Sequence, residues 1–388
     1  MNDNITPYVR YIGADDKDLD LFESQYVVPQ GISYNSYVIT DEKIAVMDTI
    51  DQRKTEEWTV RLEEALEGRT PDYLIVQHME PDHAANIGWF AEKYPEATIV
   101  ASAKAIQMMP QFFEEVNFAG RTQTVKEGDT LCLGQHTLKF IMAPMVHWPE
   151  VMLTYEESEK ILFSADAFGK FGALCHEGEW IDEARRYYFN IVGKYGAQVQ
   201  ALLKKAAGLD IAMICPLHGP VLKENLGYYI GLYDTWSKYE PETEGVVVAY
   251  ASIHGNTAAA ARRMAEILSE KGATEVMLID LCRDDMALAV ESAFRYSKMI
   301  VAASSYDAGV FPPMFDFLHH LQIKNFQKRR VGIIENGSWA PAAARLMRTK
   351  LEEMKDIHLY ETVVSLRGAL NQTSEAQMDA LVAELCAE

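Results

Sequence analysis

Four short apolar segments of this chain each run into a histidine or an acidic residue, and this feature most constrains the fold. The segments are Tyr73–Val76, Lys139–Ala143, Ile161–Ala165 and Ile211–Cys215. Each is rich in strand-forming residues and is followed by polar or Pro-containing sequence, which predicts a buried strand that delivers a loop. A fold in which these strand ends converge would gather the polar side chains in one site.

The first of these loops, Gln77–His83, carries two imidazoles and two carboxylates within six positions. Imidazoles suit zinc, iron, copper or nickel, and carboxylates add hard oxygen donors. Pro81 fixes its own φ and favours an extended Glu80, so successive side chains point to different sides. The loop at one strand end can therefore supply ligands to two metal ions. The alternative is an ordinary solvent-exposed polar loop without a metal. The candidate ligands here are His78, Glu80, Asp82 and His83.

The three other strands lead to His147, Asp166 and His218. A single histidine after a strand is more often an ordinary surface or core residue than a ligand. Three such ends beside the first loop reverse that expectation. Seven ligands fit two metal ions that share one bridging carboxylate, for which Asp166 is the natural candidate.

Strand-rich blocks interleaved with helices cover residues 1 to about 240. This pattern predicts an αββα layering, with sheets inside and helices outside. We expect β-hairpins at 36–49 and 152–164, a β-meander at 122–144, and helices at 53–67, 84–93, from about 183, and 223–238.

The polar stretch Tyr239–Gly245 predicts a linker, and beyond it strands and helices alternate strictly. Five βα units with a strongly apolar first strand predict a parallel, doubly wound, flavodoxin-like sheet. We therefore expect two domains, at 1–240 and 246–388. The expected strands are 246–251, 275–280, 299–304, 330–335 and about 358–363.

Three strand ends of the second half carry groups suited to a flavin phosphate and a flat heterocycle. Hydroxyls, backbone N–H groups and a helix N-terminus together predict a phosphate cradle, and Gly255 allows close backbone approach. We predict FMN binding, and the absence of a Gly-x-Gly-x-x-Gly fingerprint argues against direct NAD(P)H binding. The candidate FMN residues are Ser252, His254, Gly255, Asn256, Thr257, Ser304, Ser305, Tyr306, Asp307, Gly309, Asn336, Gly337, Ser338 and Trp339.

Composition excludes several classes of protein. A formal net charge of −21 argues against a nucleic-acid partner. No apolar run approaches the ~20 residues that span a bilayer, and the N-terminus lacks a signal-peptide pattern, so we expect a cytoplasmic protein without membrane contact. The five cysteines include no Cys-x-x-Cys pair, which makes a disulfide framework or a rubredoxin-like module unexpected.

The ligand pattern resembles the metallo-β-lactamase superfamily, whose order is His-x-His-x-Asp-His, then His, Asp and His. In this chain Glu80 stands where the hydrolases carry their second histidine. The pattern His-x-Glu-x-Asp-His is similar to that of the flavodiiron proteins, and the resemblance covers nearly the whole chain. It implies that one iron is held by His78, Glu80 and His147 and the other by Asp82, His83 and His218, with Asp166 between them.

The resemblance further implies an oxidoreductase that passes electrons from FMN to two iron ions and reduces O2 to water, NO to N2O, or both. It implies a separate electron donor such as rubredoxin, and a head-to-tail homodimer, which could pair further into a dimer of dimers, with Trp148 beside the opposing flavin. Tyr195 lies where family members can place a ring over the metals, but a helix-packing role is an equal alternative. We expect His136 and His176 at the surface.

Two other classes of function stay open. A zinc-dependent hydrolase with a fused flavodoxin domain would share most of the ligands, and Glu80 argues against it. A flavin-binding electron carrier without catalysis would share the second domain.

Overall fold

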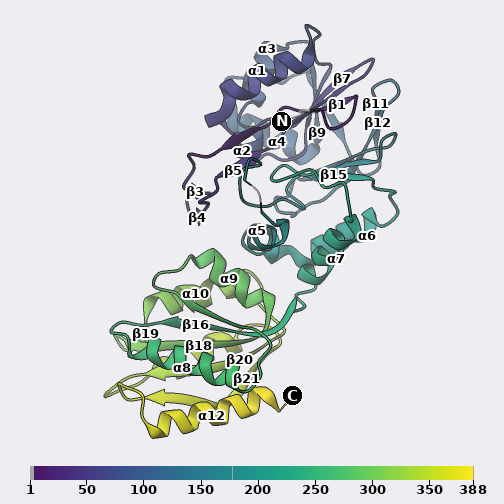
Figure 1. Cartoon of the computed structure of the whole chain (residues 1–388). Coiled ribbons are helices and arrows are strands. Elements are labelled where there is room, and N and C mark those ends of the chain that lie inside the picture. The colour runs from purple at the N-terminus through teal and green to yellow at the C-terminus, as the bar shows by residue number, and fades with distance from the viewer. Residues whose placement is uncertain (1–3, 177, 388) are drawn as a thin grey trace. The chain divides into compact units, whose positions relative to one another are not determined.

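The computed structural model describes residues 4–176 and 178–387, which form two compact units (Figure 1). The first unit comprises Met1–Tyr188 and Ala197–Asp234, and the second comprises Phe189–Gly196 and Thr235–Glu388. The domain limits 1–240 and 246–388 stay predictions.

The first sheet of the first unit has six strands in the order β1-β6-β7-β8-β9-β10. The antiparallel pair β6 and β7 forms the hairpin expected at 36–49, and β8, β9 and β10 continue from β7 in parallel. These strands are β1 (Val9–Tyr11), β6 (Tyr37–Thr40), β7 (Ile44–Met47), β8 (Tyr73–Val76), β9 (Thr98–Ser102) and β10 (Thr122–Val125).

The second sheet has five strands in the order β11-β12-β13-β14-β15, of which only β14 and β15 pair in parallel. The expected meander at 122–144 is wrong in one respect, because β10 belongs to the first sheet. β10 instead pairs in parallel with β9. A local sequence pattern does not reveal which strands pair with each other. The strands are β11 (Thr130–Cys132), β12 (Thr137–Met142), β13 (Met152–Glu156), β14 (Ile161–Phe163) and β15 (Met213–Cys215).

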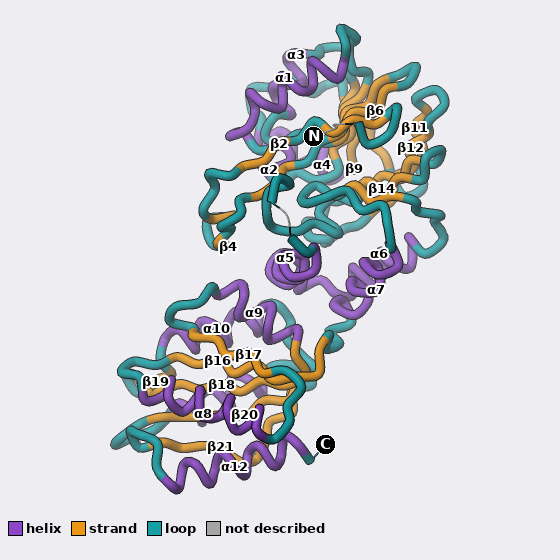
Figure 2. The backbone as a smooth tube through the Cα atoms, viewed as in Figure 1, coloured by secondary structure: helices purple, strands orange, loops and turns teal. Residues whose placement is uncertain are grey.

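The two sheets of the first unit enclose a common apolar core. Met47 and Ile75 of the first sheet share it with Phe140 and Phe163 of the second. Strand side chains alternate between faces, so the intervening residues of the second sheet point outward. Helices cover the outer faces, which confirms the αββα prediction (Figure 2). They are α1 (Thr55–Leu66), α3 (Ile87–Lys93) and α4 (Ala103–Phe112) by the first sheet, and α6 (Gly196–Ala206) and α7 (Leu226–Ser237) by the second.

Shorter elements complete the first unit. They are β2 (Ala14–Asp16), β3 (Leu21–Phe22), β4 (Tyr26–Val27), β5 (Ile32–Tyr34), η1 (Gln52–Lys54), α2 (Pro81–Ala84) and α5 (Trp180–Tyr187). The helix expected from about residue 183 is not continuous. After α5 the chain passes through the π-helix η2 (Tyr188–Val192) and the 3-10 helix η3 (Gly193–Tyr195) before α6. Gly196 is required there, because a Cβ atom would lie 2.4 Å from the Ser237 carbonyl oxygen.

The second unit is a doubly wound sheet of five parallel strands in the order β17-β16-β18-β20-β21, with β19 as a short antiparallel addition to β18. This is the strand order of a flavodoxin, as predicted. The strands are β16 (Thr243–Ala251), β17 (Val276–Asp280), β18 (Tyr296–Tyr306), β19 (Gly309–Val310), β20 (Arg329–Asn336) and β21 (Ile357–Leu366). The helices are α8 (Asn256–Glu270), α9 (Met286–Arg295), α10 (Pro312–Ile323), α11 (Ala343–Glu352) and α12 (Gln372–Cys386).

The structure also bears on the predicted linker, on two histidines and on membrane-spanning helices. Thr243–Gly245, expected in the linker, already belong to β16. His136 is buried rather than at the surface, because its Nδ1 lies 2.7 Å from a carboxylate oxygen of Asp41 in the β6–β7 turn, whereas His176 is exposed as expected. Across the described residues, every helix is too short or too polar to cross a bilayer.

Candidate functional site

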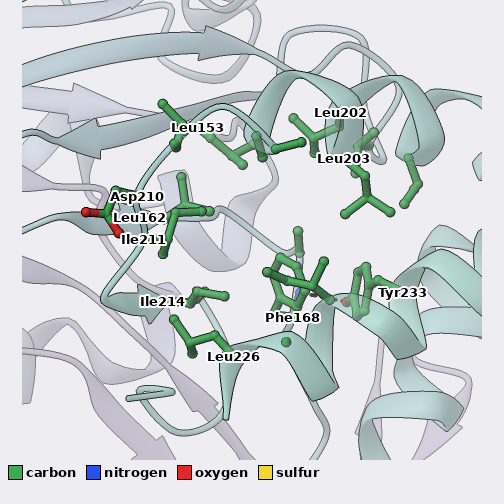
Figure 3. Close-up of a pocket in the computed structure, with 18 residues that line it drawn as sticks. Leu153, Leu162, Phe168, Leu202, Leu203, Asp210, Ile211, Ile214, Leu226 and Tyr233 are labelled. Carbon is green, nitrogen blue, oxygen red and sulfur yellow. Dashed lines mark hydrogen bonds between the residues drawn. The ribbon is translucent and has the colours of Figure 1, made fainter. Parts of the chain in front are cut away.

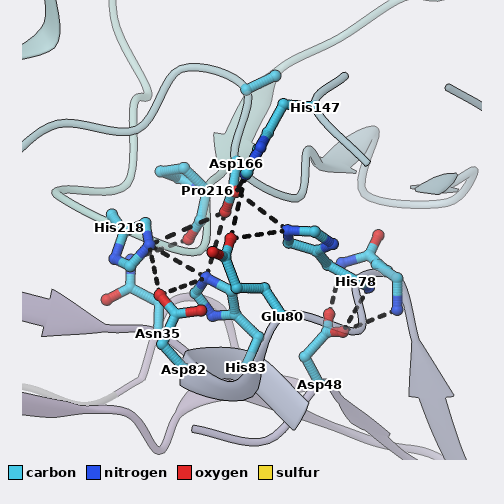
Figure 4. A network of polar contacts seen from close by, with 12 residues as sticks. Asn35, Asp48, His78, Glu80, Asp82, His83, His147, Asp166, Pro216 and His218 are labelled. Carbon is cyan, nitrogen blue, oxygen red and sulfur yellow. Dashed lines mark hydrogen bonds and ion pairs between the residues drawn. The ribbon is translucent and has the colours of Figure 1, made fainter. Parts of the chain in front are cut away.

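Four of the predicted metal ligands meet in a first group at the strand ends of the first unit (Figure 4). The Glu80 Oε2 atom lies 3.2 Å from His78 Nε2 and 3.1 Å from His147 Nε2. The Asp166 Oδ2 atom lies 3.0 Å from His147 Nε2 and 3.4 Å from His78 Nε2. Two carboxylate oxygens and two imidazole nitrogens therefore converge on one point.

The other three predicted ligands form a second group beside the first. Asp82 Oδ2 lies 3.2 Å from the Nε2 atoms of both His83 and His218, and these two nitrogens are 3.0 Å apart. Asp166 turns its other oxygen, Oδ1, to this group, at 3.2 Å from His83 and 3.9 Å from His218. One carboxylate thus faces both groups, as a bridging ligand would.

Local sequence explains how the first loop reaches both groups. Glu80 is extended, with φ −61° and ψ 137°, and it immediately precedes the short helix α2, whose first residue is Pro81. This matches the constraint that a proline places on the residue before it. Glu80 therefore turns to the first group, while Asp82 and His83 on α2 turn to the second.

Two of the predicted ligand histidines are oriented through their Nδ1 atoms. His78 Nδ1 lies 2.8 Å from Glu150 Oε1, which also accepts a bond from the Met79 N–H. His218 Nδ1 lies 2.7 Å from the carbonyl oxygen of Ser33. An Nδ1–H that is donated outward leaves the Nε2 lone pair facing the cluster, which is how metal-binding histidines are usually held.

Backbone loops around the cluster are also tied by buried polar side chains. Asp48, at the end of β7, accepts hydrogen bonds from the backbone and side-chain N–H groups of Gln77. Asn35 donates to the carbonyl oxygens of Pro216 and Gly219, on both sides of His218. Sequence reasoning gave these residues and Glu150 no role, because their partners are distant in the chain.

The seven side chains are almost entirely shielded from solvent, so their charges act strongly on one another. Burial and the charges of Glu80 and Asp166 raise the pKa of Asp82 to about 7. In the metal-free protein, where His78 is protonated on both nitrogens, burial raises the pKa of Asp166, but the charge of His78 and hydrogen bonds from His147 and His78 outweigh burial and lower that pKa well below its usual range. Burial lowers the pKa of His218, which favours its neutral, metal-binding form.

The cluster fits a pair of metal ions. Within the described part of the chain, both oxygens of Asp82 and the Oδ1 atom of Asp166 are buried and accept no hydrogen bond. Such atoms are costly to bury without a partner, and two imidazole Nε2 atoms 3.0 Å apart are a further mismatch that a shared cation relieves. The cluster offers a mixed set of four imidazoles and three carboxylates. Such a set suits iron better than thiolates alone or oxygen donors alone would.

Aromatic side chains surround the cluster. The Tyr187 ring lies 5.5 Å from the His218 ring, and the Trp148 ring lies 5.4 Å from the His78 ring. Burial and the charges of Asp166, Asp82 and Glu80 raise the pKa of Tyr187 well above its usual value, so its phenol stays protonated. Tyr195 lies half-buried in η3 and belongs to the second unit, so its role over the metals stays a prediction.

In the second unit, the three predicted FMN loops line one cavity of about 830 Å³. Twelve of the fourteen candidate residues line it, and only Gly255 and Gly309 are outside the lining. Gly255 has φ +91°, a conformation that favours glycine, and it directly precedes the N-terminus of α8. Ser304 contributes a buried hydroxyl that has no hydrogen-bond partner among the described residues.

Two of the candidate FMN side chains are engaged within the protein. Ser305 Oγ accepts hydrogen bonds from the N–H groups of Ala342 and Ala343, at the start of α11. The Asn336 amide exchanges two hydrogen bonds with the backbone of Gly368. Ser305 and Asn336 therefore hold the wall of the cavity in place. Their residue types alone did not distinguish this structural role from direct contact with a phosphate.

Planar and cationic groups at this cavity suit a phosphorylated heterocycle. Tyr306 and Trp339 line it with exposed rings, and 91% of Trp339 is accessible. Arg345 and Gly368 also line it and were missed from sequence. Gly368 follows the fifth parallel strand, so its place at a strand end was a usable signal, whereas Arg345 lies inside α11.

Comparisons with known proteins agree with this architecture. The sequence model of the ODP family beta lactamases matches residues 32–219. An uncharacterized protein of Methanocaldococcus jannaschii is 31% identical over 81% of this chain and 80% of its own length. An anaerobic nitric oxide reductase flavorubredoxin of Aliivibrio fischeri is 28% identical over 97% of this chain and 77% of its own length.

Solved structures resemble the whole chain. The rubredoxin oxygen:oxidoreductase of Desulfovibrio gigas has a TM-score of 0.91 and 25% identity, covering 98% of this chain and 96% of that protein. The flavodiiron protein of Giardia intestinalis also gives 0.91, at 24% identity with coverage of 98% and 95%, which shows the fold.

The fold and site therefore define a two-domain protein that joins a metallo-β-lactamase-like sandwich to a flavodoxin-like sheet. The chain belongs to the flavodiiron proteins.

Proposed function

We propose that this protein is a flavodiiron oxidoreductase that passes electrons from FMN to a pair of irons and reduces O2 to water, NO to N2O, or both. The observation that carries the proposal is the pair of adjacent donor groups with Asp166 facing each of them. The names of the relatives, which include nitric oxide and oxygen reductases, support this function over a zinc hydrolase.

In this proposal His78, Glu80 and His147 would hold one iron and Asp82, His83 and His218 the other, with Asp166, which faces both groups, as a ligand they would share. Three carboxylates would balance part of the charge of two cations, in a site whose side chains are mostly buried. Glu80 supplies an additional anionic oxygen where a hydrolase has a neutral imidazole, which favours iron and redox chemistry. When bound, the irons and the flavin supply the electrons for reduction of the gas.

The protein's own residues orient the proposed ligands and line this site. Glu150 and the Ser33 carbonyl fix two imidazoles so that their Nε2 atoms face inward. Tyr187 keeps its phenolic proton beside the second donor group and is suited to donate a hydrogen bond to a bound substrate. The phenyl ring of Phe22 packs at 5.4 Å from the His218 ring and helps to exclude water.

The second unit would bind FMN at the cavity formed by its three loops. The backbone around Gly255 and the N-terminus of α8 suit the phosphate, and Arg345 adds a cation. Tyr306 and Trp339 offer rings for stacking on the isoalloxazine.

We further propose a rubredoxin as electron donor, a cytoplasmic location and a homodimer that brings the flavin of one chain to the irons of its partner, near Trp148. These three proposals follow from family membership. Residues 1–240 would then be the diiron domain and 246–388 the FMN domain.

The test is anaerobic stopped-flow of the iron- and FMN-loaded protein, fully reduced, against O2 and NO in turn. Oxidation of the flavin with consumption of one gas, and N2O as product where the gas is NO, is the expected result. Zinc in place of iron in protein purified without added metal would favour the hydrolase. Iron and FMN present without consumption of either gas would favour the electron carrier.

A further inference from the structure

The first unit contains a second cavity that the metal site does not use. It has a volume of about 360 Å³ and lies between the outer face of the second sheet and the helices α6 and α7 (Figure 3). The sheet contributes Leu153, Leu162 and Ile214, whose neighbours in each strand point to the opposite, core face. All three are apolar and buried.

Each helix lines the cavity with one continuous face. The α6 residues recur at helical spacing, namely Val199, Leu202, Leu203 and Ala206. On α7 the lining residues are Leu226, Gly227, Ile230 and Tyr233. The charged lining side chain, Asp210, lies to one side in Figure 3, away from Phe168 and Tyr233.

The cavity has an open end and a closed end. Ala207, Gly227 and Asp210 are exposed, and Leu226 and Ile230 are half-buried, so this end meets solvent. The opposite lining is buried. The cavity is therefore a passage that is open to solvent at one end and enclosed by buried residues at the other.

The closed end lies against the loops that carry two of the proposed iron ligands. Val146 directly precedes His147, and Ala167 and Phe168 directly follow Asp166. Phe168 stacks on Tyr233 at 4.3 Å, and its N–H donates to the Tyr233 hydroxyl. The buried end of the passage is therefore lined by residues that are direct sequence neighbours of two proposed ligands.

The lining chemistry selects what can enter. A buried water needs two to four polar partners, and a mainly apolar lining provides few, so such cavities tend to stay dry and to accept xenon or small apolar molecules. An engineered apolar cavity of about 150 Å³ holds benzene, so this passage is large enough for a diatomic molecule. Ions and polar metabolites would lose their hydration here without compensation.

We propose that this passage admits the diatomic gas, O2 or NO, and holds it beside the loops of His147 and Asp166. The inference rests on the proposed function and adds a route and a holding site for its substrate. Both gases are small and weakly polar, so they partition from water into an apolar lining, and their local concentration near the irons rises.

Xenon is the probe for occupancy, because it reports on the passage without turnover. Crystals of the wild-type protein under xenon pressure should show xenon between α6, α7 and the second sheet. A passage without xenon, or one filled by a copurified acyl chain, would overturn the inference.

Gly227→Phe tests the role in turnover. A side chain at Gly227 has open space, since no atom lies within 4 Å of a Cβ built there, and a phenyl ring at this position narrows the mouth. We expect loss of the xenon site and a several-fold lower kcat/KM for the gas, with kcat at saturating gas unchanged. Ala206→Phe narrows the same passage from α6 and is the second variant.

Ala201→Phe is the matched control, because Ala201 is exposed on α6 and does not line the passage. It should retain both xenon and the wild-type kcat/KM. A blocking variant that loses xenon but keeps the wild-type kcat/KM would refute the route while leaving the proposed function intact. Wild-type protein that binds xenon but reduces neither gas would instead refute the proposed function and the role in substrate supply that rests on it.

Discussion

Glu150→Gln should weaken the binding of one iron and leave the binding of the other nearly unchanged. Glu150 Oε1 receives the Nδ1–H of His78 at 2.8 Å, and both side chains are fully buried. A hydrogen bond to a charged group contributes about 1.5–3 kcal/mol, against about 0.5–1.5 kcal/mol for a neutral pair. The substitution keeps an acceptor oxygen but removes the charge.

The expected loss is therefore about 1–2 kcal/mol in the affinity of the first donor group, or roughly 5- to 30-fold. The second group should be nearly unaffected, because His218 donates instead to the Ser33 carbonyl oxygen. At a chelator concentration where wild-type protein retains two irons per chain, the variant should retain about one. Metal analysis after dialysis measures this, and the Mössbauer spectrum shows whether the bridged pair is lost.

Glu156→Gln is the matched control. Glu156 is also fully buried and accepts two backbone hydrogen bonds, from Ser158 and Glu159, but it contacts no ligand histidine. It should lower stability without changing iron content. Loss of both irons to the same extent in Glu150→Gln, or equal loss in the control, would refute the reasoning.

Three further predictions follow from the two sites. Asp166→Asn replaces one of the two oxygens that face the donor groups, so iron should fall from two to one or fewer per chain by metal analysis; retention of two would contradict bridging. Trp339→Ala should raise the Kd for FMN about 5- to 160-fold in a fluorescence titration, since stacking contributes about 1–3 kcal/mol. Phe315→Ala, which removes a surface aromatic outside the cavity, should leave that Kd unchanged. Burial raises the pKa of Asp48 from 3.8 to about 6, so the folded state binds the proton more tightly than the unfolded state does. The unfolding free energy of metal-free protein should therefore fall by about 2 kcal/mol through this group as pH rises from 4 to 7. Asp48→Asn should lack that slope in urea titrations, and an identical slope would contradict the assignment.

Much of both sites was predictable because each candidate lies at a strand end. In the second unit the five strands are parallel, so the residues after each carboxyl end share one edge of the sheet. That rule alone gathered Ser252, Ser304 and Asn336 around one cavity. The same rule applies to Gly368, which follows β21 and lines the cavity. It was missed because its residue type alone did not suggest a role.

The supporting residues were not predictable from local pattern. Glu150 and His78 are 72 positions apart, and Ser33 and His218 are 185 apart. His136 was predicted to be exposed in a turn, but the turn that carries Asp41 packs against it and buries it. In each case a polar group is satisfied by a partner that only long-range packing supplies.

By itself the sequence determined which side chains the strands deliver, because alternation of apolar residues sets each strand and the next polar residues must follow at its end. It thereby determined the donor types, including the carboxylate of Glu80 in place of an imidazole. Only the tertiary structure decided that Asp166 faces two groups at once, which Nδ1 partners orient the histidines, and that α6 and α7 stand off the second sheet to leave an apolar passage. Those features depend on distances between elements, which arise from the packing of two sheets and their helices and from no single segment.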